Sequence, residues 1–587
     1  MLTPLDWGII VASIVASFIP ALWMARRAGS STAEFFTSGQ AAPWWLIGIS
    51  MVATTFSTDT PNLVTNLVRD GGVAANWAWW AFLLTGMTTV FFYARLWRRL
   101  GVLTDLEFYE MRYSGRPATV VRGFRAVYLG VLFNCVIMAT VNLAAAKIAN
   151  VLLGWPMGQT LLICAVLNVA FAATSGLWGV MITDLIQFGI AMTGSLAAAY
   201  YAVQQPQVGG LDGLFEKIDP QTLRLLPDPS DWGTFVTILL IPITVQWWSV
   251  WYPGAEPGGG SYIAQRMLAS RSERDAVGGT LLFNIAHYAL RPWPWIIVAL
   301  ASMLVYPTLD DIGRALPHVD PRLIGHDMAY PAMLRFLPPG LLGLMIAGLL
   351  AAYVSTISTH LNWGTSYVVH DLYRRFLRPG ESERHYVMVG RLVTAALMAV
   401  AGLLTFVLET AQTSFNLLLS VGAGTGLLYL LRWFWWRINA WSEIAAMASS
   451  FVVAVAFFVA GRQGADVPPH QSLLLSIAIT TVVWLSATWL TRPTDEAVLV
   501  SFYRRVRPAG PGWGPIAARA GAGPARTLGA SLWATLLGSA AIYGALFATG
   551  AWLYGQPARA AVFAAISVAG VAGVARLLPR VLASDAT

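Results

Sequence analysis

Charged residues and cysteines are scarce in this chain. Only 11% of its 587 residues are charged, whereas 57% are hydrophobic and the mean hydropathy is +0.61. This composition excludes a soluble globular protein, because most of the surface of such a protein would have to be apolar. The only two cysteines, Cys135 and Cys164, lie within apolar runs, which excludes a disulfide framework and a CxxC metal site. We predict an all-α polytopic membrane protein.

Catalytic motifs are also missing from the sequence. HExxH, GxSxG and paired Cys/His ligand sets are all absent, which argues against a membrane-embedded hydrolase or metalloenzyme. No soluble segment after the apolar core is long enough to form a domain that could receive a signal. A transporter-like membrane sensor and a channel stay open as alternatives to a transporter.

Lysine is nearly absent, since Lys147 and Lys217 are the only two lysines, and the net charge of +8 therefore comes from arginines. The arginines cluster between apolar runs, which is typical of membrane orientation rather than of nucleic-acid binding. If these clusters are cytoplasmic, the N-terminus lies outside and the C-terminus is cytoplasmic. The clusters include Arg26 and Arg27; Arg95, Arg98, Arg99, Arg112 and Arg116; Arg266, Arg271 and Arg274; Arg374, Arg375, Arg378 and Arg384; Arg432 and Arg437; and Arg492, Arg504, Arg505 and Arg507.

About fifteen apolar segments have the length of a membrane helix, which is about 17 to 25 residues. The first has no Lys or Arg before it, so we expect a retained helix and not a cleaved signal. We expect residues 204–231 and 306–338 to form external loops. The predicted helices are 5–24, 43–68, 75–97, 119–150, 157–174, 177–203, 232–267, 276–305, 339–373, 386–408, 411–433, 440–461, 471–490, 529–553 and 557–577.

Two of these segments contain residues that interrupt a helix. In the second segment, a polar cluster from Thr54 to Thr60 precedes Pro61, and in the seventh, Pro253 begins a run rich in proline and glycine that ends at Gly260. Unwound backbone at membrane depth is tolerated only where it lines a cavity or is buried in protein. Two broken helices about five apart in order are typical of transporters built from inverted repeats.

Hydroxyl groups line one face of the predicted helix at 339–373. Ala352, Ser355, Thr356 and Thr359 are spaced i, i+3, i+4 and i+7, with Ser358 beside them. Such hydroxyls can bond back to their own helix or pack against a neighbouring one. They can also form an ion site, and the spacing alone leaves both interpretations open.

Four stretches together resemble the sodium:solute symporter family, which includes bacterial proline, sugar and sialic-acid transporters and mammalian sodium/glucose cotransporters. They are SGLWGVMITDLIQFG at 175–189, YIAQRMLASRS at 262–272, VGRLV around Arg391, and AAYVSTISTHLN followed by HDLY. The resemblance covers residues from about 5 to 490. It implies an inverted five-helix-repeat fold and sodium-coupled symport of a small organic solute into the cell by alternating access. It also implies a bacterial-type inner membrane location.

The resemblance divides the chain into five parts. Residues 1–42 form an extra N-terminal helix, 43–433 form the transporter core, and 434–490 form the C-terminal helices of the family. Residues 491–528 form a cytoplasmic loop rich in Arg, Pro and Gly, and 529–587 form two peripheral helices. We expect the solute, sodium ions and the lipid bilayer as partners, no nucleic acid, and a functional monomer.

The resemblance also implies the ligands of one or two sodium ions. The main site would use the backbone carbonyls of Ala53, Phe56 and Ala352 with the hydroxyls of Ser355 and Thr356. Such a set suits sodium, which is a hard cation that takes about five oxygen ligands. A second site would use Asp184, Ser355, Ser358 and Thr359. Alternatively, Asp184 is structural and bonds the helix ends at the turn from Thr174 to Leu177.

The solute is expected at the two breaks, where Asp59 and Glu256 supply carboxylates. Two carboxylates facing one cavity would favour an amine, an amino-acid-like molecule or another cationic or zwitterionic solute. Sugars and carboxylates stay open as alternatives, and Asp59 could instead cap the second half-helix. Further solute contacts are predicted from Trp248, Trp251, Tyr252 and, by resemblance only, Asn416. His287 and Arg291 are unusual in an apolar setting, although Arg291 could simply extend its charge to the membrane surface.

Overall fold

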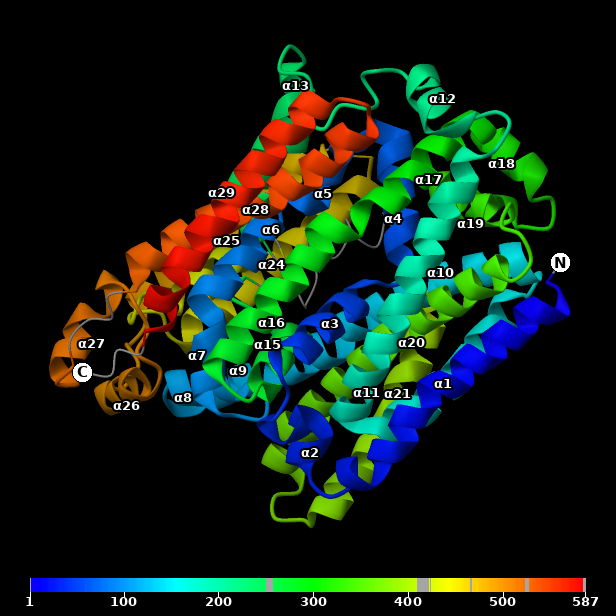
Figure 1. Cartoon of the computed structure of the whole chain (residues 1–587). Coiled ribbons are helices and arrows are strands. Elements are labelled where there is room, and N and C mark those ends of the chain that lie inside the picture. The colour runs from blue at the N-terminus through cyan, green and yellow to red at the C-terminus, as the bar shows by residue number, and fades with distance from the viewer. Residues whose placement is uncertain are drawn as a thin grey trace.

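The computed structural model describes residues 2–249, 257–408, 422, 424–464, 467–522 and 527–583, and in this part of the chain it is almost entirely helical (Figure 1). The single β-bridge found there joins Ala42 and Ser270. Ten helical stretches among these residues are long and apolar enough to cross a membrane, and three shorter ones are also apolar. The fold is therefore that of a polytopic helical membrane protein. The count of about fifteen spans stays a prediction, because most of 411–433 lies outside the described residues.

The helices follow one another in the order that the apolar segments predict. In the first half of the chain the α-helices are α1 (Pro4–Ala28), α2 (Thr32–Thr37), α3 (Trp44–Thr55), α4 (Asp59–Gly71), α5 (Trp77–Trp80), α6 (Leu83–Thr88), α7 (Ala94–Leu100), α8 (Glu107–Arg112), α9 (Gly115–Val127), α10 (Asn134–Leu153), α11 (Met157–Val203), α12 (Gly210–Lys217), α13 (Trp232–Phe235), α14 (Ile241–Thr244), α15 (Ser261–Ala269), α16 (Glu273–Ile285) and α17 (Pro292–Val305). They continue with α18 (Leu309–Ala315), α19 (Ala329–Leu334), α20 (Leu341–Ser366), α21 (Glu383–Thr405), α23 (Gly426–Leu431), α24 (Ala440–Arg462), α25 (Pro469–Leu490), α26 (Glu496–Val506), α27 (Gly514–Arg519), α28 (Leu528–Leu553) and α29 (Pro557–Leu582).

The predicted break in the second segment is confirmed. α3 ends at Thr55, Phe56 leaves the helical region with φ −90° and ψ 86°, and α4 begins at Asp59. Pro61 lies in the first turn of α4, where a proline needs no backbone donor. An unwound stretch of three residues therefore separates the last carbonyls of α3 from the first amides of α4.

The second interruption begins earlier than predicted. The chain leaves the α-helix after Thr244, and α15 begins only at Ser261, whereas Pro253 was expected to mark the break. Local hydrogen bonds explain the early end, since the Trp248 indole donates to the Thr244 carbonyl (3.0 Å) and the Ser249 hydroxyl donates to the Gln246 carbonyl (2.6 Å). Residues 250–256 lie outside the described part of the chain.

The two predicted helices, 157–174 and 177–203, are present as the two halves of α11, which a kink separates. The kink is at Gly176, whose φ of +56° and ψ of −172° belong to a backbone conformation that is available mainly to glycine. The half after the kink contacts α3, α17 and α20. The kink therefore decides where Asp184 meets those helices.

Several arginines that the sequence places in loop clusters are buried inside the protein. Arg95, Arg112, Arg266 and Arg432 expose 2%, 0%, 0% and 1% of their surface. The Arg112 guanidinium donates to the carbonyls of Trp435 and Trp436 and lies 4.6 Å from the centre of the Trp513 ring. The prediction that these four serve only as orientation signals in loops is wrong, because carbonyls and aromatic faces of the protein solvate them.

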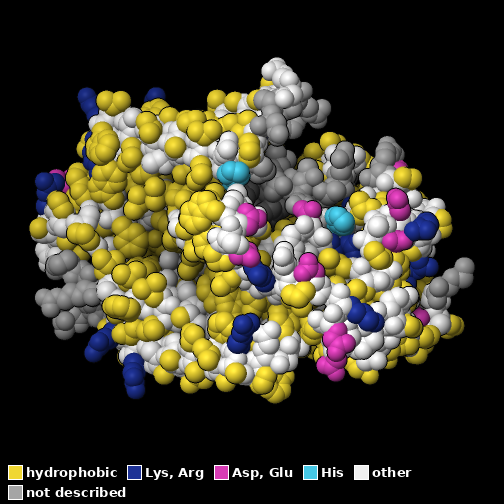
Figure 2. Space-filling view, turned by 90° about the horizontal axis from the view of Figure 1, so that it is seen from above, with side chains coloured by type: hydrophobic (Ala, Val, Ile, Leu, Met, Phe, Trp, Pro, Cys, Tyr) yellow, Lys and Arg dark blue, Asp and Glu magenta, His cyan; other side chains and the backbone are white. Residues whose placement is uncertain are grey.

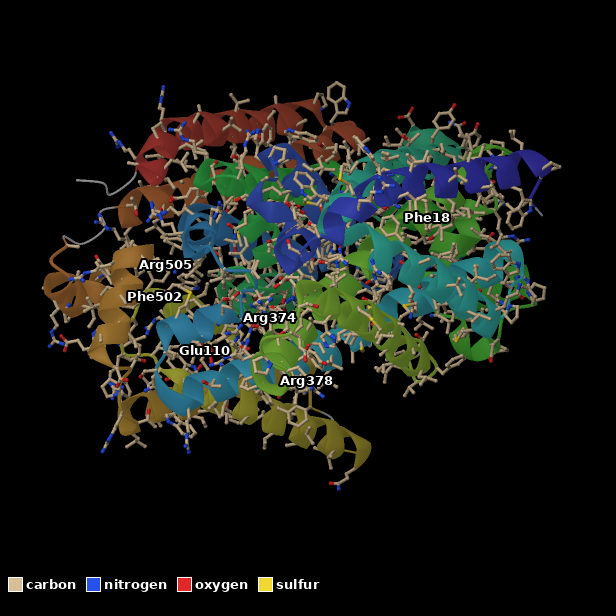
Figure 3. All side chains as sticks on the ribbon, turned by 90° about the horizontal axis from the view of Figure 1, so that it is seen from below. Phe18, Glu110, Arg374, Arg378, Phe502 and Arg505 are labelled. Atoms are coloured by element: carbon tan, nitrogen blue, oxygen red, sulfur yellow. The ribbon has the colours of Figure 1, made fainter. Side chains whose placement is uncertain are left out.

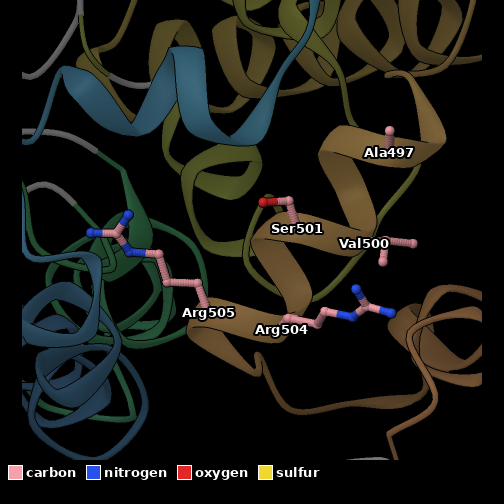
Figure 4. A pocket seen from close by; sticks show the side chains of 5 residues that line it. All are labelled: Ala497, Val500, Ser501, Arg504 and Arg505. Atoms are coloured by element: carbon pink, nitrogen blue, oxygen red, sulfur yellow. The ribbon is translucent and has the colours of Figure 1, made fainter.

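The segment from α26 to α27 packs beneath the core, next to α7 and α8 (Figure 1). Phe502 and Arg505 lie in this region, and Glu110, Arg374 and Arg378 lie in the neighbouring part of the same end of the molecule (Figure 3). The Arg505 side chain donates to the Leu100 carbonyl at the end of α7. Figure 4 shows that Arg504 and Arg505 leave α26 in different directions around a shallow surface pocket lined also by Ala497, Val500 and Ser501. Side chains of this segment, such as Arg505, thus bond it to the rest of the protein.

α28 and α29 pair with each other, and α28 also packs on α6. The Tyr543 hydroxyl donates to the Trp80 carbonyl, and the Trp293 indole donates to the Leu546 carbonyl, both at 2.8 Å. α29 presents exposed apolar side chains such as Val562 and Val568 on its other face. Hydrophobic side chains cover broad areas of the surface seen in Figure 2, as expected of a protein whose solvent is lipid.

Candidate functional site

The hydroxyl stripe of α20 lies in the interior of the protein. Ser355, Thr356, Ser358 and Thr359 each expose 1% or less of their surface. α20 contacts α3, α10, α11 and α15, so helices from the first half of the chain surround the stripe. Four buried hydroxyls in one place need polar partners, and those partners define the site.

Thr356 joins the stripe to the end of the first broken helix. Its hydroxyl lies 2.7 Å from the Thr54 carbonyl of α3 and 3.0 Å from the Ala352 carbonyl of its own helix. The Ala53 carbonyl, one residue away, accepts the Phe56 amide at 3.0 Å. The structure therefore places Thr356 and Ala352 of the predicted main site beside the end of α3, whereas the Ser355 hydroxyl bonds Asp184. Among the four hydroxyls, only that of Thr356 bonds back to α20.

Ser355 contacts Asp184 on α11. Its hydroxyl donates to Asp184 Oδ1 at 2.5 Å, and the Ser50 hydroxyl of α3 donates to Oδ2 at 2.6 Å. Asp184 is fully buried. Its partners among the described side chains lie on α3, α15 and α20, and they do not include a residue at the turn from Thr174 to Leu177, so they favour a role for Asp184 in the polar cluster.

The other two residues of the predicted second site lie close by but are not equally engaged. Thr359 Oγ1 is 3.1 Å from Thr54 Oγ1 on α3. Ser358 faces α11, where its hydroxyl is 3.5 Å from Asn168 Oδ1. Asp184, Ser355 and Thr359 thus share one polar cluster, whereas Ser358 lies at its edge.

A buried arginine enters this same cluster. Arg266 of α15 donates to Thr359 Oγ1 at 2.7 Å and to Ser50 Oγ at 3.2 Å, and its Nη2 is 4.0 Å from Asp184 Oδ2. The guanidinium also donates to Gln265 Oε1 at 3.0 Å. A cation of the protein itself therefore lies among oxygens that the sequence assigns to a second sodium ion. This arrangement balances the charge of the buried Asp184.

The first turns of α4 carry polar atoms that are buried without a hydrogen-bond partner among the described residues. They include Asp59 Oδ1, both amide atoms of Asn62 and Thr65 Oγ1. Asn62 and Thr65 are fully buried. Residues spaced by three lie along one side of a helix, so these atoms form a polar stripe that starts at the break. Unpaired buried polar groups are costly, and a bound molecule could satisfy them.

Arg291 and His287 lie on the other side of the break. The Arg291 guanidinium donates to the Val52 carbonyl at 3.2 Å and also bonds His287, whose Nδ1 is 3.0 Å from the Thr55 hydroxyl. Arg291 exposes only 1% of its surface, so it does not extend its charge to the membrane surface. The break thus combines one acidic and one basic side chain.

Of the remaining predicted solute residues, Trp248 is the one that the structure describes, and it lies elsewhere. Trp248 is half-buried and packs with Ile241, Leu473 and Ile477, in a small apolar cluster between α14 and α25. No described contact joins it to Asp59. Trp251, Tyr252, Glu256 and Asn416 lie outside the described residues.

Sequence reasoning missed several residues of the polar cluster. Thr54 lies in the last turn of α3, Ser50 lies one turn before it, and Asn62 and Thr65 follow the break, so a search of both half-helices for hydroxyl and amide side chains would have found them. Arg266 was counted as a loop residue. Its position inside the YIAQRM stretch, five residues after the start of α15, was the available signal.

The site as a whole is rich in hydroxyl and carbonyl oxygens and poor in soft ligands. No group of three or more His, Cys, Asp and Glu side chains that could hold a metal ion occurs in the part of the chain that the structure describes. Such oxygens suit a hard monovalent cation held inside a membrane. Fold and site together define a polytopic helical membrane protein with an oxygen-rich polar cluster beside a broken helix.

The chain belongs to the sodium:solute symporter family, whose model matches residues 35–451. It is 25% identical over 492 residues to a sodium/glucose cotransporter of Vibrio parahaemolyticus, and this match covers 81% of the chain and 88% of the relative. It is 24% identical to sodium/glucose cotransporter 2 of Rattus norvegicus, with 70% of the chain and 64% of the relative covered. As a member of this family of sodium-coupled transporters, the chain is not an enzyme.

A solved structure supports the same fold. The structure of a Na⁺-coupled sialic acid symporter in its substrate-bound, outward-open state superimposes with a TM-score of 0.64, at 18% identity, over 84% of this chain and 99% of that chain. At this identity the likeness concerns the fold alone. It agrees with the predicted arrangement of an all-α transporter.

Proposed function

We propose that the chain imports a small organic solute that carries an amino group, and that the solute binds at the break between α3 and α4. The observation that carries this proposal is the polar stripe of Asp59, Asn62 and Thr65, whose buried atoms have no partner among the described residues. Asp59 would accept the ammonium group, and Arg291, whose guanidinium donates to the Val52 carbonyl just before the break, would suit a carboxylate on the same molecule. A zwitterion such as an amino acid fits this pair of charges.

A sugar is the second candidate. The relatives from Vibrio parahaemolyticus and rat are named sodium/glucose cotransporters, and the unpaired amide of Asn62 can both donate to and accept from a neutral hydroxyl. In this case Asp59 would accept hydrogen bonds from sugar hydroxyls. The two candidates differ in how much binding should depend on the negative charge of Asp59.

A thermal-shift screen distinguishes these solutes. Purified protein is heated with amines, amino acids, sugars and carboxylates, each with and without sodium, because a ligand that binds only the folded state raises the melting temperature. We expect the largest sodium-dependent shift with a zwitterion. Asp59→Asn should weaken its binding by about 1.5 to 3 kcal/mol, which is a loss of about 10- to 150-fold. Asp70→Asn, on the same helix but exposed, is the matched control. A screen that returns only sugars would defeat the charge argument.

For sodium, we propose a main site formed by the carbonyls of Ala53, Phe56 and Ala352 with the hydroxyls of Ser355 and Thr356. The bonds from Thr356 to the end of α3 support this assignment. We propose a second sodium site at Asp184, Ser355, Ser358 and Thr359. It can fill only when Arg266 moves away, because the guanidinium already contacts Thr359 Oγ1 and lies beside Asp184 Oδ2. The number of sodium ions bound, one or two, would then depend on the position of α15.

We also propose that the protein works as a monomer in a bacterial-type inner membrane, with its N-terminus outside and its C-terminus cytoplasmic. The exposed arginines Arg504 and Arg505 on α26 support a cytoplasmic position for residues 491–528. Reactivity of single cysteines introduced at positions 212 and 504 towards an impermeant reagent tests this topology. Residue 212 should react from outside the cell, and residue 504 should react only after permeabilisation.

Alternating access would follow from an inverted repeat in which α3–α4 and the interrupted segment 232–269 occupy equivalent places. The interruption of both elements supports this assignment. Saturable uptake that follows a sodium gradient would exclude a channel, and uptake of any kind would exclude a sensor without transport activity. These assays require only the purified protein in liposomes.

A further inference from the structure

An apolar cavity lies beside the first break, between α1, α10, the first half of α11 and α20. Its volume is about 140 Å³. Most of its walls are aliphatic, with Ile10 and Ile14 from α1, Ile148 and Leu152 from α10, Ile163 from α11 and Leu349 from α20. None of the predicted sodium ligands lines it. The cavity therefore calls for an explanation separate from the ion site.

The hydroxyl groups in its walls are already satisfied by the protein. Thr58 donates to the Val141 carbonyl at 3.1 Å, Thr160 donates to the Pro156 carbonyl at 3.3 Å, and Tyr353 donates to Asn142 Oδ1 at 2.6 Å. The cavity thus offers water almost no polar partner. Apolar cavities of about 150 Å³ stay dry and bind apolar molecules.

The cavity reaches the surface of the molecule beside exposed apolar side chains. Trp7, one of its lining residues, is 41% exposed, and its ring lies 6.2 Å from that of Trp155, which also lines the cavity. Next to it on α11, Leu162 and Val166 are 67% and 62% exposed. α1 and α10 both belong to stretches that are long and apolar enough to span a membrane. Tryptophans at the end of such helices commonly lie at the level of the lipid headgroups.

We propose that this cavity binds one acyl chain of a membrane phospholipid, with Trp7 and Trp155 near the headgroup end. The continuity of the cavity with the lipid-facing surface and its dry, apolar walls support this occupant. The inner part of the acyl chain would contact Thr58 at the first break and Leu349 on α20. The bound lipid would therefore pack against both elements that carry the proposed main sodium site, whichever solute is transported.

Photocrosslinking of the full-length protein in nanodiscs tests this proposal. The probe is a phosphatidylcholine with a diazirine in one acyl chain, and adducts are mapped by mass spectrometry after irradiation. We expect adducts on residues 145–167 at a yield at least fivefold higher than on the lipid-facing side of α29. Ala149→Phe, which places a ring in the cavity, should lower this yield at least fivefold. Val166→Phe, on the exposed side of α11, should leave it unchanged.

Two further arms keep the test decisive. Because overpacking at the buried Ala149 can impair folding, Ile163→Trp fills the cavity from its more exposed wall, and it should lower the yield in the same way. Size-exclusion chromatography identifies variants that are folded. Equal labelling of all lipid-facing helices, or full labelling in both folded variants, would overturn the proposal. So would labelling by a diazirine fatty acid in nanodiscs where the phospholipid probe gives none.

Discussion

Thr356 is the residue whose contacts most directly tie α20 to the broken helix. Its hydroxyl has bonds to carbonyls on both elements, at Thr54 and at Ala352. An ion at this place would replace those contacts with coordination by the same oxygens. The side-chain oxygen, and not the size of the side chain, should therefore determine sodium affinity.

Removing that oxygen gives the first prediction. Thr356→Ala should raise the sodium concentration for half-maximal transport about tenfold or more, which corresponds to about 1.4 kcal/mol. Thr356→Ser keeps the hydroxyl and should stay within about threefold of the unchanged protein. Ser449→Ala removes a hydroxyl that bonds only within α24 and serves as the control. Equal sodium dependence of all three variants would remove Thr356 from the ion site.

The second prediction concerns Asp184. Asp184→Asn removes the negative charge that Arg266 and a second sodium ion would share, so the Hill coefficient for sodium should fall towards one while transport persists at a lower rate. Thr356→Ala should instead change affinity and leave the Hill coefficient in place. An unchanged coefficient in Asp184→Asn, measured as uptake against sodium concentration, would show that Asp184 serves only to pair Arg266.

Arg266 and Asp184 can also be tested as a buried pair. Each single neutral variant leaves one charge without its partner, which typically costs about 3 to 5 kcal/mol of stability. The double variant Asp184→Asn with Arg266→Gln should recover a large part of that loss, as measured by thermal unfolding in detergent. Additive losses in the double variant would mean that the two charges are not coupled, despite their separation of 4.0 Å.

Among the elements, α11 depends most clearly on one residue. Gly176 holds the positive φ that separates the two halves of the helix. Gly176→Ala should destabilise the protein by about 1 to 3 kcal/mol, because a side chain is strained in this conformation. Gly189→Ala is the matched control on the same helix, where an added methyl group meets nothing within 4 Å and improves helix propensity. Equal melting temperatures for the two variants would contradict the account of the kink.

The elements also show which features can be predicted from sequence. Pro61 and the polar run before it located the first break, because proline and unsatisfied amides act locally. The second break could not be placed as well, since hydrogen bonds at Trp248 and Ser249 end the helix before the prolines. The burial of Arg266 could not be predicted either, because it depends on α3, α11 and α20 meeting α15 in three dimensions.

At the scale of the whole molecule, the hydropathy pattern predicted a helical membrane protein, and the motifs predicted its family. The family match over residues 35–451 confirms the second point. The solute could not be predicted in the same way, because it depends on a few side chains at the breaks, and Glu256 and Asn416 lie outside the described residues. The side-chain atoms of Asn62 and Thr65 that are buried without a partner among the described residues could not be predicted either, because their burial depends on how α4 packs.

The central claim is that the sodium gradient drives solute uptake through the site between α3 and α20. The most direct measurement is uptake of the best solute from the thermal-shift screen into proteoliposomes, with sodium imposed outside, inside or equally on both sides. Uptake should saturate with solute concentration, should accumulate solute above its external concentration only with inward-directed sodium, and should vanish when the gradient is dissipated. Uptake that does not saturate, or that is equal under all three sodium conditions, would contradict the account.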